Sequence, residues 1–343
     1  MRTAAGLWVV VVVMAVVAGL SCAADETTEA TAQSEAKVIR NPVADRAADP
    51  WVIRREGWYY YCYADRGGIR VHRSERLEEA LEREGELIWR PERGQAWSRG
   101  IWAPELHRLA GKWWVYFAAD DGRNETHRMY VLESRTDDAQ SRYDFRGQVK
   151  TQPDRWAIDG TVLERKGKLY FLWSGWEGDE NVAQNLYIAP MASPTEISGE
   201  RVLISRPEYA WEKVDRPLVN EGPEVLKHGE RVFVIYSASG SWADHYCLGQ
   251  LELAGEDPLK AESWVKKAEP VFAGTEGVIS PGHASFTVDA AGQDWIVYHA
   301  ARRPGAGWDR VGCMQPFGWT AEGEPDFGRP VAWGEAIAAP GSK

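Results

Sequence analysis

Cysteine is scarce in this sequence, and the few cysteines present are not spaced for a disulfide framework or a metal site. There are four of them, at Cys22, Cys62, Cys247 and Cys313. Cys22 falls at the end of an N-terminal apolar segment, which leaves an odd number for the rest of the chain. An odd number without metal-like spacing supports neither paired disulfides nor zinc binding. Cys62 lies among aromatic residues of a predicted strand, so we expect it to be buried.

Positive charge is also in deficit. The chain has 40 Lys and Arg against 51 Asp and Glu, which gives a formal net charge of −11. This balance argues against a nucleic-acid partner and says little about neutral partners. Phosphate-binding glycine loops, Ser-His-Asp signatures and zinc motifs are missing as well. The segment RNETH at residues 123–127 does not match the HExxH pattern of zinc proteases.

An apolar run long enough to cross a membrane is missing too. Arg2 precedes an apolar run from Gly6 to Leu20, and small residues follow it. The run is shorter than the roughly 20 residues of a membrane-spanning helix, so we predict that residues 1–22 are an export signal. We expect a mature chain without a membrane-spanning segment that is periplasmic, held at the cell surface as a lipoprotein, or secreted.

Two interpretations stay open for Cys22. The segment GLSC partly resembles a lipoprotein signal, in which this cysteine carries a lipid anchor, but Gly19 stands where an aliphatic residue is expected. The alternative is simple cleavage near Ala23. Residues 23–38 lack aromatic side chains and are rich in Ala, Glu and Thr, so we predict a flexible tether there.

Tryptophan and strand-forming segments are abundant. The chain has 18 Trp, most of which we expect to pack between sheets. A glycine in a short polar turn, followed by alternating aromatic and aliphatic residues, occurs five times, and an apolar strand precedes each turn. The five runs are GWYYYCYA from Gly57, GKWWVYFAA from Gly111, GKLYFLWSG from Gly167, GERVFVIYS from Gly229 and GQDWIVYHA from Gly292.

Five repeated hairpins predict an all-β fold, and more specifically a five-bladed β-propeller over residues 39–338 with about four strands in each blade. The alternative is a generic β-sandwich, which accounts less well for five matches spread along the whole domain. Helical patterns are few. The clearest one, at residues 75–86, is expected to form no more than a helix within a loop.

Aligning the repeats on their turn glycines brings titratable residues to one position. Asp49, Asp159 and Glu221 each stand eight residues before their glycine, and His283 stands nine before Gly292. The innermost strands of a propeller surround a central channel, so equivalent positions at their starts are expected to converge. Converging carboxylates repel one another, which is costly unless the cluster has a chemical task or binds a cation.

Such a cluster of carboxylates has two candidate uses, glycoside hydrolysis and metal binding. Glycoside hydrolysis needs one carboxylic acid to protonate the leaving oxygen and a second carboxylate to activate water or attack carbon. A third acid can hold one of them at a raised pKa. A metal site is the competing use, although hard cations usually take more oxygen ligands than three acids provide.

Several segments carry a resemblance to a known family. In order and content, they resemble the motifs of glycoside hydrolase family 43 from about Asn41 to about Val331. The segments are NPVADRAADPW, IWAPELH, AIDGTVLE, VNEGPEVLK and SPGHASF. The resemblance implies a five-bladed β-propeller that hydrolyses glycosides with inversion. The segments YVLES, LYIAPMASP, ISRPEYAWE and YSASGSWADHYCLGQL are also similar to the branch that contains exo-acting α-L-arabinofuranosidases.

The resemblance implies roles for the converging residues. Asp49 would be the general base that activates water, Glu221 the general acid, and Asp159 the residue that tunes the pKa of Glu221 and orients both. His283 matches a histidine beneath the sugar, which in some members helps to hold a hydrated ion such as Ca²⁺. No cofactor is expected to be required. Ala284 departs from the Asn that close members often have there, which bears on the ion and not on the three acids.

The resemblance also implies residues that contact the substrate. Arg302 lies where members place a substrate-contacting arginine, and Arg303 is the alternative. Trp51 and Trp102 are expected to form an apolar wall for the sugar, with packing in the protein core as the alternative for both.

Taken together, these features predict an exported α-L-arabinofuranosidase. Its partner would be arabinan or another arabinose-containing plant polysaccharide or oligosaccharide, from which it releases terminal arabinose. β-Xylosidase activity is the alternative within the same family. A non-catalytic carbohydrate-binding propeller is the alternative from another class, and it is disfavoured because a lectin has no need for three acids together.

Overall fold

The computed structural model describes residues 6, 8, 9, 11 and 37–342. The chain divides into two units, Met1–Glu35 and Ala36–Lys343, and all the strands of the described residues belong to the second. The predicted export signal in residues 1–22, the lipid anchor at Cys22 and most of the tether in residues 23–38 lie outside the described residues. Within the described part of the chain, no helix has the length and apolar character needed to span a bilayer.

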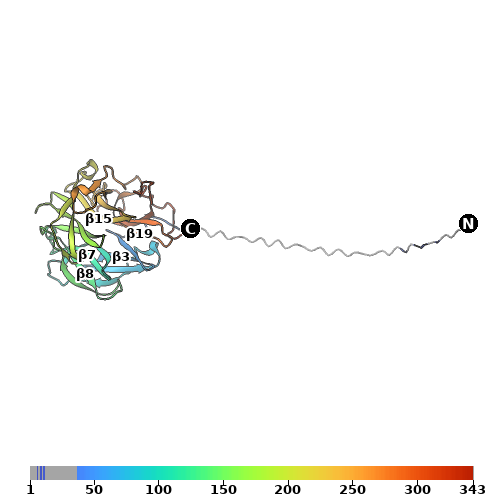
Figure 1. The fold of residues 1–343 in the computed structure, drawn as a ribbon, viewed down its shortest axis with the longest axis horizontal. Helices are drawn as coiled ribbons and strands as arrows, with labels where there is room; N and C mark the ends of the chain where they lie inside the picture. Colours follow the sequence, from blue (N-terminus) through green and yellow to red (C-terminus); the bar gives the residue numbers. More distant parts are fainter. Residues whose placement is uncertain (1–5, 7, 10, 12–36, 343) are drawn as a thin grey trace. The chain divides into compact units, whose positions relative to one another are not determined.

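The second unit consists of β-strands and a few single turns of 3₁₀ helix, which confirms the all-β prediction (Figure 1). The 3₁₀ turns are η1 (Leu77–Glu79), η2 (Asn124–Thr126), η3 (Ala210–Glu212) and η4 (Ala261–Ser263). The loop helix expected at residues 75–86 is reduced to η1. Leu77 and Leu81 are buried there against the neighbouring strands, so packing of this loop outweighs its helical pattern.

The main strands form five groups of consecutive antiparallel strands. The first group contains β2 (Trp51–Arg55), β3 (Trp58–Asp65), β4 (Gly68–Ser74) and β5 (Glu86–Trp89). The second contains β6 (Arg99–Leu109), β7 (Lys112–Asp120), β8 (Arg128–Ser134) and β9 (Tyr143–Gln148). The third contains β10 (Ala157–Arg165), β11 (Lys168–Trp176) and β12 (Ala183–Ser193), and both β13 (Glu196–Ile197) and β14 (Val202–Ser205) pair with β12.

The fourth group contains β15 (Leu218–His228), β16 (Arg231–Ala238), β17 (Cys247–Leu253) and β18 (Trp264–Lys266). A short parallel contact between β12 and β15 joins it to the third group. The fifth contains β19 (Ile279–Val288), β20 (Asp294–Ala301) and β21 (Arg310–Pro316). Two short pairs complete the unit: β1 (Val38–Ile39) with β24 (Ile337–Ala338), and β22 (Gly318–Trp319) with β23 (Pro325–Asp326).

Tight two-residue turns join the first two strands in four of the groups. In three of these turns both residues have positive φ, as at Lys166 (49°) and Gly167 (71°), which is the type I′ geometry with glycine second. In the fourth group the turn is Gly229 and Glu230, with Gly229 at φ 56°, so glycine stands first as in a type II′ turn. An alignment on the turn glycines is therefore one residue out of register in this group.

The first strands of the groups follow one another around the fold. They contact each other in the order β2, β6, β10, β15 and β19, and β19 in turn contacts β2. Hydrophobic clusters lie between neighbouring groups. The cluster between the last group and the first packs Tyr61 and Tyr63 against Trp295 and Met314. The starts of the five first strands are therefore neighbours in space, although they are far apart in sequence.

Contacts between the two ends of the unit help to hold this arrangement. The β1–β24 pair aligns Val38 with Ala338. The side-chain amide of Asn41 donates to the carbonyl oxygen of Met314 at 3.0 Å and accepts from its backbone N–H at 2.9 Å. Both bonds are buried, so the segment before β2 is tied to β21 at the other end of the unit.

Large aromatic residues fill the interior, as expected. Trp173 and Trp295 are among the largest fully buried side chains, and Trp156 stacks on Trp176 with ring centroids 4.8 Å apart. Cys62 is buried with a free thiol, which confirms its predicted packing role. Burial raises the pKa of this thiol well above its ordinary value, so it remains protonated and unreactive at neutral pH.

Close packing next to the strand starts leads to a stability prediction. A Cβ added at Gly160 would lie 2.2 Å from the buried Phe171 ring and 2.8 Å from Met129. Gly160→Ala should therefore destabilise the fold by about 1–3 kcal/mol, as overpacking does. Gly178→Ala is the control, because nothing lies within 4 Å of its added Cβ. Thermal unfolding of both variants checks this, and equal melting temperatures would contradict the packing described here.

Candidate active site

A cavity of about 690 Å³, called the main cavity below, lies where the first strands begin. Its volume is typical of small-molecule sites. All five groups of strands contribute to its lining. The contributing residues include Asp49, Trp102, Asp159, Glu221 and His283. The structure thus brings together the three acids and the histidine that the repeats placed at equivalent positions.

The backbone at the start of each first strand aims these side chains. Asp49, Asp159 and His283 have φ values of 49°, 52° and 45°, in a left-handed region that non-glycine residues rarely adopt. In β15 the equivalent left-handed residue is Gly222 (φ 53°), and Glu221 precedes it. Glu221 is therefore one position out of register with the other acids, which corrects the alignment on glycines. Backbone strain of this kind is often concentrated at functional sites.

Three basic side chains surround the Asp49 carboxylate. The guanidinium of Arg310 donates to Asp49 Oδ1 at 2.9 Å, and His283 Nδ1 lies 3.2 Å from the same oxygen. His299 Nδ1 lies 3.5 Å from it and accepts the backbone N–H of Asp49 at 3.2 Å. Burial lowers the pKa of both histidines, so Arg310 is the cation that balances Asp49 near neutral pH.

Glu221 is held in a different environment, because its side chain is buried. The hydroxyl of Tyr246 donates to Glu221 Oε1 at 2.8 Å. Burial raises the pKa of Glu221 to about 7, and the Asp49 charge adds to this, while Tyr246 and Arg310 act in the opposite direction. A carboxyl group with this pKa still carries its proton over much of the mildly acidic range.

Asp159 lies between these two acids in chain order and is also buried, with 3% of its surface exposed. The backbone N–H of Gly222 donates to Asp159 Oδ2 at 3.0 Å, which favours the ionised form. Burial, followed by the charges of Glu221 and Asp49, raises the pKa of Asp159 well above its ordinary value. The repulsion between Asp159 and Glu221 is reciprocal, so the two carboxyl groups resist being ionised together.

Two of the predicted substrate contacts are not in the main cavity. Arg302 pairs with Asp309 through Nε, at 3.1 Å from Oδ1, and it does not line the cavity. The arginines that line the cavity are Arg216 and Arg310, and the sequence analysis selected neither of them. Trp51 also lies outside, because its indole N–H donates to the carbonyl oxygen of Leu106 at 2.8 Å and its ring packs beside strand β6. For Trp51 the core-packing alternative holds.

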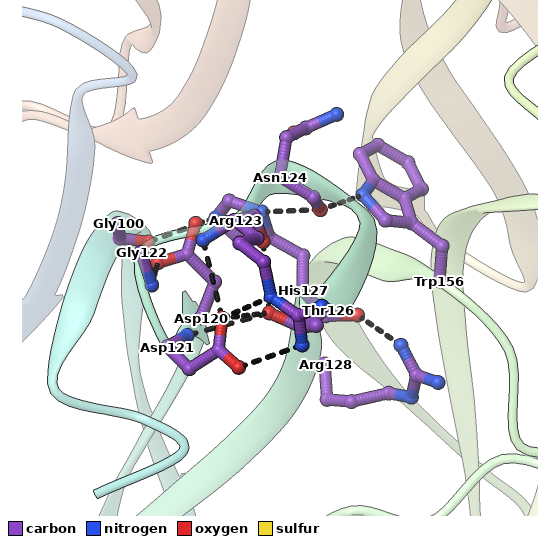
Figure 2. A network of polar contacts seen from close by, with 10 residues as sticks. All are labelled: Gly100, Asp120, Asp121, Gly122, Arg123, Asn124, Thr126, His127, Arg128 and Trp156. Atoms are coloured by element: carbon purple, nitrogen blue, oxygen red, sulfur yellow. Dashed lines mark hydrogen bonds and ion pairs between the residues drawn. The ribbon is translucent and has the colours of Figure 1, made fainter. Parts of the chain in front are cut away.

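Trp102 does line the main cavity, and a network of polar contacts holds the wall to which it belongs (Figure 2). Its indole stacks on the buried ring of His127 with centroids 3.8 Å apart. His127 Nδ1 lies 3.0 Å from the carbonyl oxygen of Asn124, and His127 Nε2 lies 3.0 Å from the carbonyl oxygen of Gly100. The indole N–H of Trp156 donates to the carbonyl oxygen of Asn124 at 2.8 Å, and Figure 2 draws this bond as a dashed line.

This network therefore fixes three residues that line the cavity. They are Trp102, Asn124 and Trp156. Sequence reasoning missed Asn124 and Trp156, since neither stands at a repeated position. The one signal in the sequence for this network was the run of closely spaced polar residues at 120–128. In the structure, side chains and carbonyl groups of this loop surround His127.

The residues near His283 leave little room for the expected ion. A second cavity of only about 10 Å³ lies against His283, with Glu105 and Glu224 in its wall. This is near the lower limit for a single water molecule. Among the residues that the structure describes, no group of three or more His, Cys, Asp or Glu side chains is arranged to hold a metal. The residues present do not fit a directly bound Ca²⁺, which takes about six to eight oxygen ligands.

The chemistry available in the main cavity follows from these differences in environment. Glu221 is a carboxyl group that keeps its proton to about pH 7, and Asp49 is a carboxylate paired with a guanidinium. A protonated carboxyl group and a carboxylate in one cavity can serve as an acid and a base on either side of one bond. Tryptophans supply flat apolar surface beside them, which suits the C–H faces of a sugar ring.

Comparisons with known proteins agree with this chemistry. The sequence profile of glycosyl hydrolases family 43 matches residues 39–325. An extracellular exo-α-(1→5)-L-arabinofuranosidase of Streptomyces avermitilis is 37% identical over 321 residues, which are 89% of this chain and 66% of that protein. A protein of the same description from Streptomyces chartreusis is 36% identical over 269 residues, covering 76% of this chain and 81% of the relative.

Solved structures give the same picture. An α-L-arabinofuranosidase from Lactobacillus brevis superposes with a TM-score of 0.81 at 35% identity, covering 86% of this chain and 98% of that structure. A thermostable family-43 glycoside hydrolase superposes with a TM-score of 0.70 at 23% identity, covering 86% of this chain and 99% of its own, and at this identity it supports the fold alone.

Proposed function

The chain belongs to family 43 of the glycosyl hydrolases, and from this premise we propose that it is an exo-acting α-L-arabinofuranosidase. It releases terminal α-L-arabinofuranosyl residues from arabinan or from arabinose-decorated polysaccharides and oligosaccharides. The observation that carries the proposal is the meeting, in one cavity, of a buried Glu221 with a pKa of about 7 and an Asp49 paired with Arg310. The arabinofuranosidase relatives support arabinose as the sugar.

In the proposed mechanism, Glu221 protonates the oxygen of the leaving group while Asp49 takes a proton from a water molecule. The water attacks the anomeric carbon from the face opposite the leaving group, so the configuration inverts. Arg310 holds the Asp49 carboxylate in place, and the Asp49 backbone is fixed by its hydrogen bond to His299. Positioning of this kind lowers the barrier, because the reacting groups are already aligned.

Asp159 is proposed to act through Glu221. It raises the pKa of Glu221 by like-charge repulsion, and its hydrogen bond from the Gly222 N–H fixes the backbone next to that acid. Burial is the main cause of the raised pKa of Glu221, and the Asp49 charge adds to it. Repulsion from Glu221 raises the pKa of Asp159, and because this repulsion is reciprocal we propose that Asp159 contributes at Glu221 as well.

We also infer that the domain is a five-bladed β-propeller, with each group of strands forming one blade. The ring of contacts from β2 through β6, β10, β15 and β19 back to β2 supports this, and so does the likeness to structures of family 43. The main cavity then lies at one end of the central channel, where the inner strands begin. The catalytic domain is taken as residues 39–338.

Two further assignments remain proposals. Export from the cytoplasm agrees with relatives described as extracellular, and lipid anchoring at Cys22 stays a hypothesis that labelling with a radioactive fatty acid would test. A hydrated ion near His283 also stays a prediction, and no step of the proposed mechanism involves it.

The substrate assignment can be tested by comparing two chromogenic substrates. We expect hydrolysis of an aryl α-L-arabinofuranoside at a kcat/KM at least tenfold above that of an aryl β-D-xylopyranoside, equal to about 1.4 kcal/mol. A preference for the xyloside would make the protein a β-xylosidase. No turnover of either substrate, with arabinose binding intact, would favour a carbohydrate-binding propeller.

The raised pKa of Glu221 predicts the pH dependence. The acid must be protonated to act, and its pKa lies at about 7, above the ordinary 4.5. Activity should therefore be present below pH 7 and be lost as the pH rises through about 7. Asp159→Asn removes the carboxyl group that resists being ionised together with Glu221, so the pKa of Glu221 should fall and this alkaline limb should move to lower pH.

Tyr246→Phe provides the opposite control. The Tyr246 hydroxyl donates to Glu221 and lowers its pKa, so its removal should move the alkaline limb to higher pH. Profiles of kcat/KM against pH for both variants and the parent check these shifts, with melting temperatures recorded alongside. If the Asp159→Asn limb stays in place while its melting temperature falls, Asp159 only supports its strand and does not tune Glu221.

A further inference from the structure

The rim of the main cavity beside Glu221 is built by two loops. Residues 239–246 connect β16 to β17, and residues 302–309 connect β20 to β21. Ser241 and Trp242 from the first loop and Trp308 from the second line the cavity. Neither tryptophan belongs to a repeated strand position, and neither has a part in the mechanism described so far.

Trp308 is unusual because it is exposed and yet held in place. Its side chain is 69% exposed, so it contributes little to the core. Its indole N–H donates to the Ser241 hydroxyl at 3.3 Å, which fixes one edge of the ring. The backbone N–H of Gly305 also donates to the Asp244 carboxylate at 2.9 Å, so the two loops are tied together. A large apolar ring kept in the solvent in this way is informative, because packing does not explain it.

The position of Trp308 relative to the acid indicates which part of a substrate it meets. The Ser241 side chain, which holds the Trp308 indole, is near enough to Glu221 to lower its pKa, and all three residues line the main cavity. An acid that protonates the leaving oxygen must lie on the side of the leaving group. The surface next to Glu221 therefore faces the leaving-group sugar. It does not face the terminal sugar, whose anomeric carbon the water attacks.

From this geometry we propose that Trp308, together with Trp242, forms the subsite for the leaving group, in which a second pentose ring packs its C–H face on the exposed indole. The proposal rests on the arabinofuranosidase function proposed above and deepens it. Its consequence is a preference for leaving groups that are themselves sugars, as in α-(1→5)-linked arabino-oligosaccharides. Trp102 lies on the other wall, where His127 supports it, and is left for the terminal sugar.

Gly240 shows how the second tryptophan of this subsite is placed. A Cβ at Gly240 would lie 2.5 Å from the Trp242 indole, so the ring folds directly over the glycine. An alanine there has to displace the indole, and this moves Trp242 without removing it. Gly240→Ala therefore perturbs the same subsite as Trp308→Ala from the other loop.

The test compares two substrates that differ only in the leaving group. In α-(1→5)-linked arabinotriose the leaving group is a sugar, arabinobiose, whereas α-L-arabinofuranosyl fluoride has a leaving group too small to reach Trp308. Trp308→Ala should raise KM for the triose about tenfold and leave kcat/KM for the fluoride within about twofold of the parent. Trp308→Phe should recover most of the triose affinity, because it keeps an aromatic face. Val265→Ala, at a valine that is 55% exposed on β18, is the control for truncation of an exposed apolar residue.

The outcomes separate this inference from the proposed function. A parent enzyme that hydrolyses neither substrate overturns the function itself. A parent that hydrolyses both, with an equal loss on the two substrates in Trp308→Ala, or with no loss on either, overturns the leaving-group subsite alone. Unfolding is not expected for so exposed a residue, and an unchanged melting temperature of Trp308→Ala verifies that the comparison is valid.

Discussion

Glu221→Gln should lower kcat/KM on arabinotriose by about 10²–10⁴-fold, the range that general acids contribute. The sugar leaving group departs as an unstable anion unless a proton reaches its oxygen. Gln has nearly the same shape and keeps an oxygen that can accept from the Tyr246 hydroxyl, so the packing around position 221 is retained. The loss then reports the missing proton and not a disturbed site.

The leaving group provides the internal control for this variant. A fluoride or a dinitrophenolate departs without a proton, so Glu221→Gln should keep the parent rate within about tenfold on such substrates. The alkaline limb near pH 7 should also disappear from the remaining activity, because the group that titrates there is gone. An equal loss on activated and natural substrates would remove Glu221 from the role of acid.

Asp49→Asn should be slow on every substrate, with kcat lower by about 10³-fold or more. Activation of the attacking water is needed whatever the leaving group, and an amide cannot take the proton. The backbone N–H of residue 49 still reaches His299, so the left-handed turn before β2 is expected to survive. Arg310 loses its charged partner at Oδ1, which is the one structural cost of the change.

In Asp49→Asn, a binding measurement distinguishes a loss of catalysis from a loss of substrate binding. Calorimetric titration with arabinotriose should give a Kd within a few-fold of the KM of the parent enzyme. If Asp49→Asn instead hydrolyses the fluoride at the parent rate, water is activated by another group. If binding is lost together with turnover, the residue holds the substrate and the role of base is unsupported.

The strands and the cluster of acids could be predicted from the sequence because both depend on local patterns. Turn glycines and alternating aromatic residues located the first hairpin of every group, and equivalent positions before those hairpins brought Asp49, Asp159 and His283 to one cavity. The register of Glu221 was wrong by one residue, because Gly229 is the first residue of its turn and not the second. Turn type depends on the φ of both turn residues, and the spacing of glycines alone does not reveal it.

The rest of the site depends on loops, and there the sequence was insufficient. Arg302 is the first residue of the loop between β20 and β21, and Arg310 directly follows this loop, so the fold of the loop decides which of them enters the cavity. Asp309 pairs with Arg302, and Arg310 at the start of β21 is thereby the one that reaches Asp49. Trp156 and Trp308 were missed for the same reason, since each depends on a partner distant in sequence, Asn124 and Ser241.

The central claim is that Asp49 and Glu221 act across one glycosidic bond to release arabinose with inversion. Proton NMR during hydrolysis of an α-L-arabinofuranoside tests it most directly, because the first anomer of the free sugar is seen before mutarotation. The account predicts that β-L-arabinofuranose appears first and that the α anomer follows slowly. Initial release of the α anomer would contradict it, since Asp49 would then be a nucleophile and not the base that activates water.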